Sequence, residues 1–315
     1  MPAPEKGMIS CHSKPDSGVA FEMPAGPIPR CPACLSLLHR MPENSKPQGS
    51  RCKSCGLIVQ PHCEGPADLE NMVRHYRAVD PHEKVAISKT GFFQNALDYL
   101  DSKVTRIPRH LLDVGCGFGY FLEKAMDYGW EPIGVDVVPE AVFSAQRRVP
   151  TAGVFLGDLR KANLPTGSID AVTMWDVLCH VEDPAAELQE CHRILAPGGI
   201  VGLRVRNVEI QLWLCRWYSG PFRLLRRLRV KPLHVFHHYN FTRSAIERLL
   251  ENNGFVNLSV RNSPLTTGDP YEYTSVSALV QLCKFMAGAL ADIVFRLTSG
   301  RWILSPSLLV WAQKP

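Results

Sequence analysis

The sequence predicts an α/β protein, with a mostly parallel sheet covered by helices on both faces and preceded by a small cysteine-bearing module. Three observations lead to this prediction. From residue 109 onward, short apolar runs alternate with helical segments, which is the pattern of strand–helix–strand units. One apolar run leads into a glycine-rich turn, and two Cys-x-x-Cys pairs stand near the N-terminus. With 315 residues the chain has room for about two domains, and we expect the module to be separate from the sheet.

The composition restricts the function classes. Hydrophobic residues make up 45% of the chain and charged residues 21%, as in ordinary globular proteins. The net charge of +5 is too small to indicate a nucleic-acid-binding protein. No secretory signal is visible, so we expect a cytoplasmic location, where paired cysteines indicate metal ligands before disulfides. The most apolar stretch, 275–297, contains Lys284, Asp292 and Arg296, which argues against a membrane span and favours an interfacial or core helix.

The expected regions are a disordered leader (1–29), the cysteine module (30–66), a helical linker or cap (67–105) and the main domain (106–315). In the main domain, we expect buried strands at 110–114, 132–135, 153–156, 171–175, 200–205, 256–260 and 307–312. Helices are expected near 120–128, 139–147, 184–194 and 244–253. Right-handed crossovers between such strands build a mostly parallel sheet. Two insertions, at about 207–243 and 272–300, follow the fifth strand.

The segment 111–122 combines the end of a strand, a glycine turn and the start of a helix. Its glycines follow the pattern Gly-x-Gly-x-Gly, with Tyr120 where a dinucleotide fingerprint has its third glycine. Asp113, at the end of the strand, would repel a phosphate group. A carboxylate at this place suits a cationic amino group instead.

Two further carboxylates follow the next two strands. Asp136 stands where nucleoside-binding α/β folds accept hydrogen bonds from ribose hydroxyls. Asp158 is placed to receive the exocyclic amine of an adenine, with the Leu159 backbone N–H directed at the ring. A lone Asp more often caps a helix or turn. All three carboxylates fall at the carboxyl ends of strands, where such sheets bind ligands, so together they favour a nucleoside with a cationic amino group.

These motifs resemble those of class I S-adenosylmethionine-dependent methyltransferases, in the ubiquinone-biosynthesis-like (type 11) small-molecule subgroup. Residues 113–119 resemble the first motif of that family, 169–181 the fourth, and 195–199 the turn before the fifth strand. The resemblance implies a Rossmann-like seven-stranded sheet whose last strand, 307–313, runs antiparallel. It also implies S-adenosyl-L-methionine as cofactor, with direct methyl transfer. The implied cofactor-binding residues are Asp113, Gly115, Cys116, Gly117, Gly119, Asp136, Val137, Asp158, Leu159 and Trp175.

Histidines provide the candidates on the acceptor side. His180 follows the fourth strand, where the family faces its acceptor, and histidine titrates near neutral pH, so His180 is the candidate base. Many relatives have Glu-His-Val where this chain has Cys179-His180-Val181; packing or helix capping is the competing role. The resemblance also implies that His234 and His237 line the acceptor pocket. We rank this role above metal binding, since no carboxylate cluster accompanies them.

The cysteine module carries the second strong motif. Cys31 and Cys34 form one Cys-x-x-Cys pair, and Cys52 and Cys55 form the other. Two such pairs make a closed tetrahedral site for structural Zn²⁺. A redox pair would require a Cys-x-x-Cys at a helix start, and a ligand exchange with His62 or Cys63 remains open. The module resembles the zinc ribbon that precedes many methyltransferases.

A cationic and aromatic stretch lies between residues 201 and 245. Three interpretations remain open for it: a solvated helix face, a surface for anionic lipid or a lipid-linked acceptor, and a nucleic-acid track. The members of this stretch are Arg204, Arg206, Arg216, Arg223, Arg226, Arg227, Arg229, Lys231 and Arg243, with Trp213, Trp217, Tyr218 and Phe222 between them. Together with the apolar stretch 275–297, this stretch would form an apolar and cationic rim beside the acceptor site.

The leading functional hypothesis is a methyltransferase for a small-molecule or lipid-linked acceptor, with possible peripheral contact to the anionic inner face of a membrane. The alternative is an RNA methyltransferase that binds RNA through the zinc ribbon and the cationic stretch. The ribbon is poor in cations, and neither an Asn/Asp-Pro-Pro-Tyr clamp nor a Pro-Cys nucleophile follows the fourth strand. A third hypothesis is binding without turnover. The sequence leaves the acceptor and the oligomeric state open.

Overall fold

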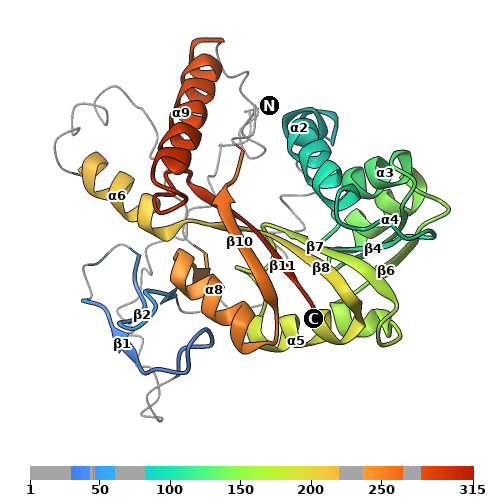
Figure 1. Cartoon of the computed structure of the whole chain (residues 1–315), viewed down its shortest axis with the longest axis horizontal. Helices are drawn as coiled ribbons and strands as arrows, with labels where there is room; N and C mark the ends of the chain where they lie inside the picture. The colour runs from blue at the N-terminus through green and yellow to red at the C-terminus, as the bar shows by residue number, and fades with distance from the viewer. Residues whose placement is uncertain (1–29, 43–44, 46, 61–81, 220–236, 265–277) are drawn as a thin grey trace, which may run out of the picture.

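The computed structural model describes residues 30–42, 45, 47–60, 82–219, 237–264 and 278–315. Its centre is a seven-stranded sheet in the order β10-β11-β8-β7-β4-β5-β6 (Figure 1). The strands are β4 (His110–Val114), β5 (Glu131–Asp136), β6 (Gly153–Leu156), β7 (Ile169–Trp175), β8 (Leu195–Arg206), β10 (Val256–Asn262) and β11 (Ser307–Gln313). β11 runs antiparallel to both of its neighbours, and the other adjacent pairs are parallel. The predicted fold class is therefore confirmed.

Helices cover both faces of this sheet. On one face, α2 (His82–Asp101) and α3 (Tyr120–Asp127) enclose a core that includes Phe92, Phe121 and Trp175. On the other face, α5 (Pro184–Ile194) and α8 (Arg243–Asn252) bury Leu188 and Leu249. The remaining helical elements are α4 (Pro139–Arg148), η1 (Leu159–Ala162), α6 (Val208–Ser219) and α9 (Ala278–Leu297). No helix in the described ranges is both long and apolar enough to cross a membrane.

The cysteine module forms a second sheet with a strand of the main domain. β1 (Leu38–Arg40), β2 (Ser50–Cys52) and β3 (Ile58–Val59) pair in that order, and β9 (Tyr239–Asn240) completes the sheet beside β3. In Figure 1 the blue module lies against the orange α8. Cys31 and Leu57 share one buried core with Phe241 and Leu249. The module is therefore not a separate unit, because strands of two or three residues cannot enclose a core of their own.

Most element boundaries agree with the sequence prediction within two residues. β8 begins at Leu195 rather than near residue 200, since Leu195 already pairs with Ile169 before an irregularity in the ladder. Asp158 does not end a strand: β6 stops at Leu156. Several predictions lie outside the described residues, namely the leader, the roles of His62, Cys63 and His234, and the central part of the cationic stretch (220–236).

Candidate functional site

The glycine loop between β4 and α3 has a backbone that only glycine adopts easily. Gly115, Gly117 and Gly119 have φ angles of 72°, 53° and 79°, all in the left-handed region. A Cβ on Gly115 would lie 2.3 Å from Val177 Cγ2, whereas a Cβ on Gly117 would meet nothing within 4 Å. Gly115 is thus needed for packing inside the protein, and Gly117 borders open space that a ligand can fill. Cys116 is buried between them.

Asp136 connects the glycine loop to the end of β5. Its Oδ2 accepts a hydrogen bond from the Gly117 backbone N–H at 2.8 Å, and its Oδ1 accepts one from Val138 N–H at 2.9 Å. Burial raises the pKa of this carboxyl, and the hydrogen bonds from Val138 and Gly117 oppose that shift. Val137, between Asp136 and Val138, is half exposed. The carboxylate therefore fixes two loops at the same edge of the sheet.

Asp113 is a buried carboxyl at the end of β4. Burial raises its pKa to about 7, the nearby Asp136 charge adds to the increase, and a hydrogen bond from Thr173 Oγ1 opposes it. Two carboxyl groups thus face one small region beside the glycine loop. When Asp113 is ionised, this region attracts a cation.

Asp158 and Leu159 lie at the start of η1. Asp158 Oδ1 accepts a hydrogen bond from the Lys161 backbone N–H at 3.0 Å, which is the capping role, and the residue is exposed. Leu159 is buried.

Trp175 ends β7 inside an aromatic cluster: its ring makes edge-to-face contacts with Phe92 and Phe121. Trp175 thus packs in the core, and its Nε1 has no hydrogen-bond partner among the described residues.

Charged groups gather just beyond β7. Asp176 lies 3.3 Å from Arg204 and 3.6 Å from Lys89. Burial alone would raise the pKa of Asp176, but the positive charges of Arg204, Lys89 and Arg206 lower it to about 2. Sequence reasoning missed Lys89, because a single lysine in a helix gives no signal of its own. Its charge also acts on Asp113, so it lies near both acidic groups.

His180 and His237 meet at the same end of the sheet. Their ring centroids are 4.3 Å apart, although one follows β7 and the other precedes β9. Burial lowers the pKa of His237 to about 3, and the charges of His180 and Arg206 add to this decrease, so His237 is neutral at pH 7. Donor atoms of Cys179, His180 and His237 lie within 4.8 Å of one another, close enough for one metal ion. The structure thus brings together two of the three predicted histidines.

The four cysteines of the module converge. Cys31 Sγ lies 3.5 Å from Cys55 Sγ, and Cys34 Sγ lies 3.4 Å from Cys52 Sγ. All four sulfur atoms are within 4.8 Å of one another. Four thiolates around a tetrahedral Zn²⁺, with Zn–S distances of about 2.3 Å, stand roughly 3.8 Å apart. A hydrogen bond from Cys55 holds the pKa of the Cys31 thiol below its usual range. The donor set and its geometry therefore fit zinc.

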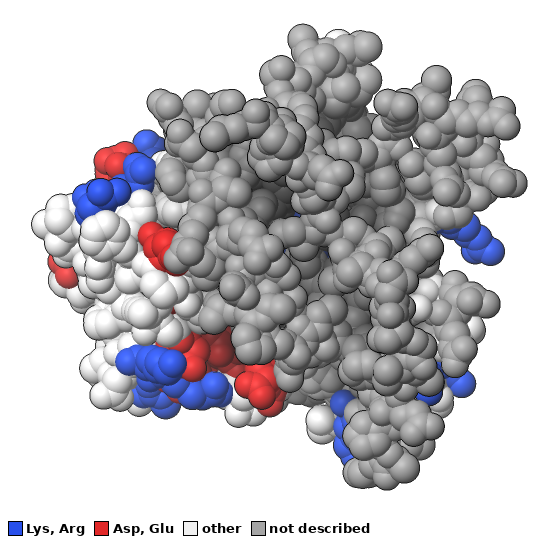
Figure 2. All heavy atoms as spheres, turned by 180° about the vertical axis from the view of Figure 1, so that it is seen from behind, with Lys and Arg blue, Asp and Glu red and all other residues white. Residues whose placement is uncertain are grey.

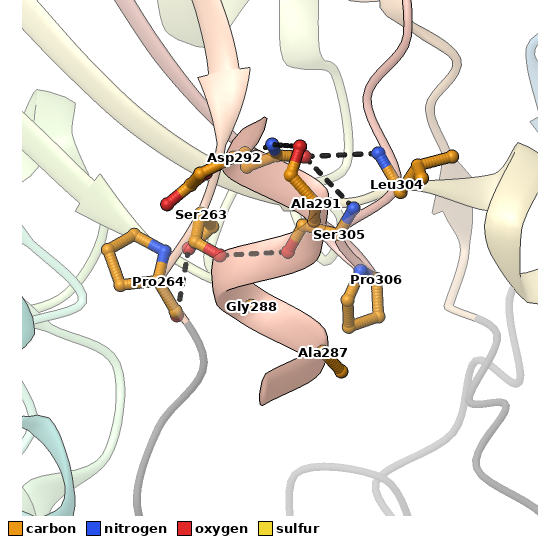
Figure 3. Close-up of a pocket in the computed structure, with 10 residues that line it drawn as sticks. Ser263, Pro264, Ala287, Gly288, Ala291, Asp292, Leu304, Ser305 and Pro306 are labelled. Atoms are coloured by element: carbon orange, nitrogen blue, oxygen red, sulfur yellow. Dashed lines mark hydrogen bonds between the residues drawn. The ribbon is translucent and has the colours of Figure 1, made fainter. Parts of the chain in front are cut away.

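A small cavity lies away from these groups, between α9 and the strands β10 and β11 (Figure 3). Its volume is about 70 Å³. Ala287, Gly288 and Ala291 of α9 line it, and its polar atoms bond to one another, as in the 2.8 Å contact from Ser305 Oγ to Ser263 O. It contains none of the candidate residues and acts as the joint between α9 and the sheet.

The comparison with protein families gives the family of this chain. A family model described as "Methyltransferase domain" matches residues 74–260. The chain belongs to this family. The expectation of a class I methyltransferase fold is thus confirmed, and the glycine loop with Asp113 and Asp136 lies inside the matched region.

Curated relatives agree with this assignment. A probable S-adenosylmethionine-dependent methyltransferase of Mycolicibacterium smegmatis is 31% identical over 147 residues, which are 47% of this chain and 52% of the relative. A ubiquinone biosynthesis O-methyltransferase of Xanthomonas oryzae pv. oryzae is 35% identical over 117 residues, which are 35% of this chain and 48% of the relative. The chain thus spans about half the length of the curated relatives it matches.

Among solved structures, this chain is similar to a chain in the complex between the Haloferax volcanii Trm112 methyltransferase activator and a methyltransferase. The sequence identity is 17% and the TM-score 0.50, with 79% of this chain and 98% of that chain covered. At this identity the likeness concerns the fold alone.

Proposed function

We propose that this chain transfers a methyl group from S-adenosyl-L-methionine to a small-molecule or lipid-linked acceptor. The observation that carries this proposal is the open space at Gly117 beside the two buried carboxyls Asp113 and Asp136. The cofactor supplies an activated methyl group on a sulfonium sulfur, and its ammonium group is a second cation. Both fit an acidic region. We assign the ribose hydroxyls to Asp136, with Val137 beside it, and the adenine to Asp158 and Leu159.

The amino-acid end of the cofactor carries a carboxylate as well as an ammonium group. We assign the ammonium to Asp113 and the carboxylate to Lys89, whose positive charge acts on both Asp113 and Asp176. Oδ1 of Asp176 and Nε of Arg204 are buried without hydrogen-bond partners among the described residues. These atoms offer further polar contacts to a ligand at the end of β7.

On the acceptor side, His180 is the proposed general base. It is exposed and adjoins neutral His237, so a proton taken from an acceptor hydroxyl or amine has a route to solvent. A positioned base contributes about 10²–10⁴-fold to such a reaction. His237 lines the pocket beside it, and His234 is proposed to do the same.

The lipid-linked form of the acceptor is supported by α9. Its small residues line the cavity of Figure 3, and its other side exposes six large apolar side chains. These are Leu282, Phe285, Met286, Leu290, Ile293 and Leu297. Trp213 of α6 is also exposed. A helix of this kind rests in the interface of a membrane with its apolar face buried, so we propose peripheral contact at the cytoplasmic face of an anionic membrane.

RNA is the less favoured acceptor. In Figure 2, the Lys and Arg side chains at the left of the described surface lie beside Asp and Glu, and those at the right stand as separate groups, so the described part of this face shows no continuous basic track. Phosphate binding requires many unopposed cations.

The cysteine site is proposed to hold one structural Zn²⁺ per chain. Its ligands would be Cys31, Cys34, Cys52 and Cys55, whose sulfur atoms already converge. The closed set of four thiolates leaves no position for a reacting water, so the contribution of the metal would be folding energy.

Isotope-labelled S-adenosylmethionine tests the proposed activity. We expect purified protein to transfer label to the small-molecule or lipid fraction of a cell extract, and Gly117→Val to abolish the transfer. Gly167→Val is the matched control, since Gly167 also has positive φ and open space at its Cβ. Label found in RNA instead would support the alternative, and cofactor binding without any labelled product would indicate binding without turnover.

Vesicle flotation tests the membrane contact. The protein should bind anionic vesicles at low salt and leave them at high salt, and the double change Phe285→Glu, Leu290→Glu should abolish binding. Phe143→Glu, at an exposed phenylalanine of α4, should have no effect. Equal binding by all three proteins would contradict the role of α9.

A further inference from the structure

The structure joins the cysteine module to the acceptor side through the short strand β9. We infer that the module positions the acceptor side: when its four-cysteine site is loaded, the module holds β9, and β9 holds His237 against His180. Asn240 is the positioning residue between them. This inference rests on the proposed function for the role of the two histidines. Neither the cysteine pairs nor the histidines indicate such a coupling by themselves.

The first step of the coupling is the attachment of the cysteine pairs to α8 and its N-cap. In the first pair, Ala33 O accepts a hydrogen bond of 2.9 Å from Asn252 Nδ2. In the second pair, Cys55 O accepts one of 2.5 Å from Thr242 Oγ1. A Cβ on Gly56, which follows Cys55 at φ +80°, would lie 2.8 Å from Thr242 Cγ2. The two cysteine pairs are thus in direct contact with the methyltransferase domain.

The second step is the pairing of β3 with β9. Ile58 pairs with Asn240 and Val59 with Tyr239. The Gln60 backbone N–H extends the ladder by donating to His238 O at 2.8 Å. Among the described strands, β3 is the only one paired with β9, so the module provides the sheet partner of this segment.

The third step leads from β9 to both histidines. Asn240 is 1% exposed; its Oδ1 accepts from the His237 N–H at 2.9 Å, and its Nδ2 donates to His237 O at 2.6 Å. Tyr239 N–H donates to Cys179 O at 3.1 Å, and Tyr239 Oη donates to Glu182 O at 2.9 Å. These last two bonds hold the segment on either side of His180.

The energetic consequence follows from the size of the module. Three strands of two or three residues fold stably only with an added constraint, which four thiolates around one metal ion provide. Without it, β3 loses its order and β9 loses its strand partner, so His237 is held less firmly, by the Asn240 and Tyr239 bonds alone. The glycine loop and Asp136 lie on other strands and, within the described ranges, make no hydrogen bond or ion pair with the module, so the cofactor side should be unaffected.

Hydrogen exchange read by mass spectrometry tests the coupling in the full chain. On removal of the metal by a chelator, amides of residues 237–242 should exchange at least tenfold faster, while those of 111–119 remain unchanged. Carbethoxylation of His237 by diethyl pyrocarbonate should also rise at least fivefold relative to His192. Added Zn²⁺ should reverse these changes, and S-adenosylmethionine affinity, measured by calorimetry, should remain within about threefold throughout.

A pair of variants tests the strand contact with the metal in place. Gln60→Pro removes the backbone donor to His238 O and should reproduce the faster exchange of 237–242 and the greater reactivity of His237, with zinc content unchanged. Gln60→Ala keeps that donor and removes only the long 3.5 Å contact from Asn240 Nδ2 to Gln60 Oε1, while Asn240 keeps its bonds to His237, so this variant should behave as the unmodified protein.

Unchanged exchange in 237–242 after metal removal, or identical behaviour of the two Gln60 variants, would overturn the inference. Loss of cofactor binding on metal removal would also overturn it, because the module would then stabilise the whole domain. Failure of the proposed function is distinguishable, since it would appear as absent cofactor binding in the metal-loaded protein.

Discussion

The two halves of the proposed site are built in different ways. The cofactor edge, with Asp113, the glycine loop 115–119 and Asp136, lies within two consecutive strand–loop–helix units. The acceptor edge combines the residues after β7 with His237 before β9, and the cysteine module supports it from the other end of the sequence. Lys89 of α2, which we assign to the cofactor carboxylate, lies beside Asp176 between the two edges. The first edge is therefore set by local backbone geometry. The second requires the tertiary fold to be complete.

The strongest test of the cofactor edge is Asp136→Ala. This change removes the acceptor of the Gly117 and Val138 N–H bonds and the proposed bonds to the ribose. We expect S-adenosylmethionine to bind about 10–100-fold more weakly, since charge-assisted hydrogen bonds contribute about 1.5–3 kcal/mol. Calorimetry measures the affinity, and exchange of residues 237–242 should not change. An unaltered affinity would remove Asp136 from the site.

The pH dependence of cofactor binding sharpens the role of Asp113. Its pKa of about 7 in the folded protein means that Asp113 is half ionised at pH 7 and mostly protonated at pH 6. Only the ionised form attracts a cation, so affinity should fall about fivefold from pH 7 to pH 6. Asp113→Asn should bind more weakly and show no such fall. A wild-type affinity that is constant over this range would contradict the assignment.

The same shift has a consequence for stability. Because burial raises the pKa of Asp113 above its unfolded value of 3.8, the folded protein keeps a proton that the unfolded chain releases between about pH 4 and pH 7. Burial of Asp113 therefore destabilises the fold most above pH 7, and Asp113→Asn should remove this part of the pH dependence in thermal unfolding.

Lys89→Gln tests whether the Lys89 ammonium group belongs to the cofactor edge as well as to the charged cluster around Asp176. The change removes the partner proposed for the cofactor carboxylate, and Arg204 still neutralises Asp176. We expect a three- to tenfold loss of S-adenosylmethionine affinity, a smaller effect than that of Asp136→Ala. Lys103→Gln is the control. It changes a lysine just after α2 whose ammonium group lies over the Tyr99 ring, and it should leave the S-adenosylmethionine affinity unchanged. Equal effects of the two changes would indicate a general effect of charge.

The difference between the edges also explains what the sequence could predict. Periodicity and the glycine pattern located the strands of the main sheet and the three carboxylates, because each lies in one continuous segment. Lys89 gave no signal, since its partner Asp176 is distant in sequence and one cation in a helix is usually solvated. The docking of the module was missed for a similar reason: β9 has two residues, too few for any alternation. For Trp175 the sequence predicted the cofactor side and could not show that its ring also packs against Phe92 and Phe121, because the face that the last residue of a strand joins depends on the tertiary fold; its role at the cofactor stays a prediction.

The hydrogen-exchange footprint of S-adenosylmethionine on the metal-loaded protein is the direct test of a cofactor site at the glycine loop. We expect slower exchange in residues 113–119, 136–138 and 158–159 when the cofactor is present, with the β1–β2 region of the module unchanged. Protection confined to the module, or no protection along 113–119, would contradict a cofactor site at the glycine loop.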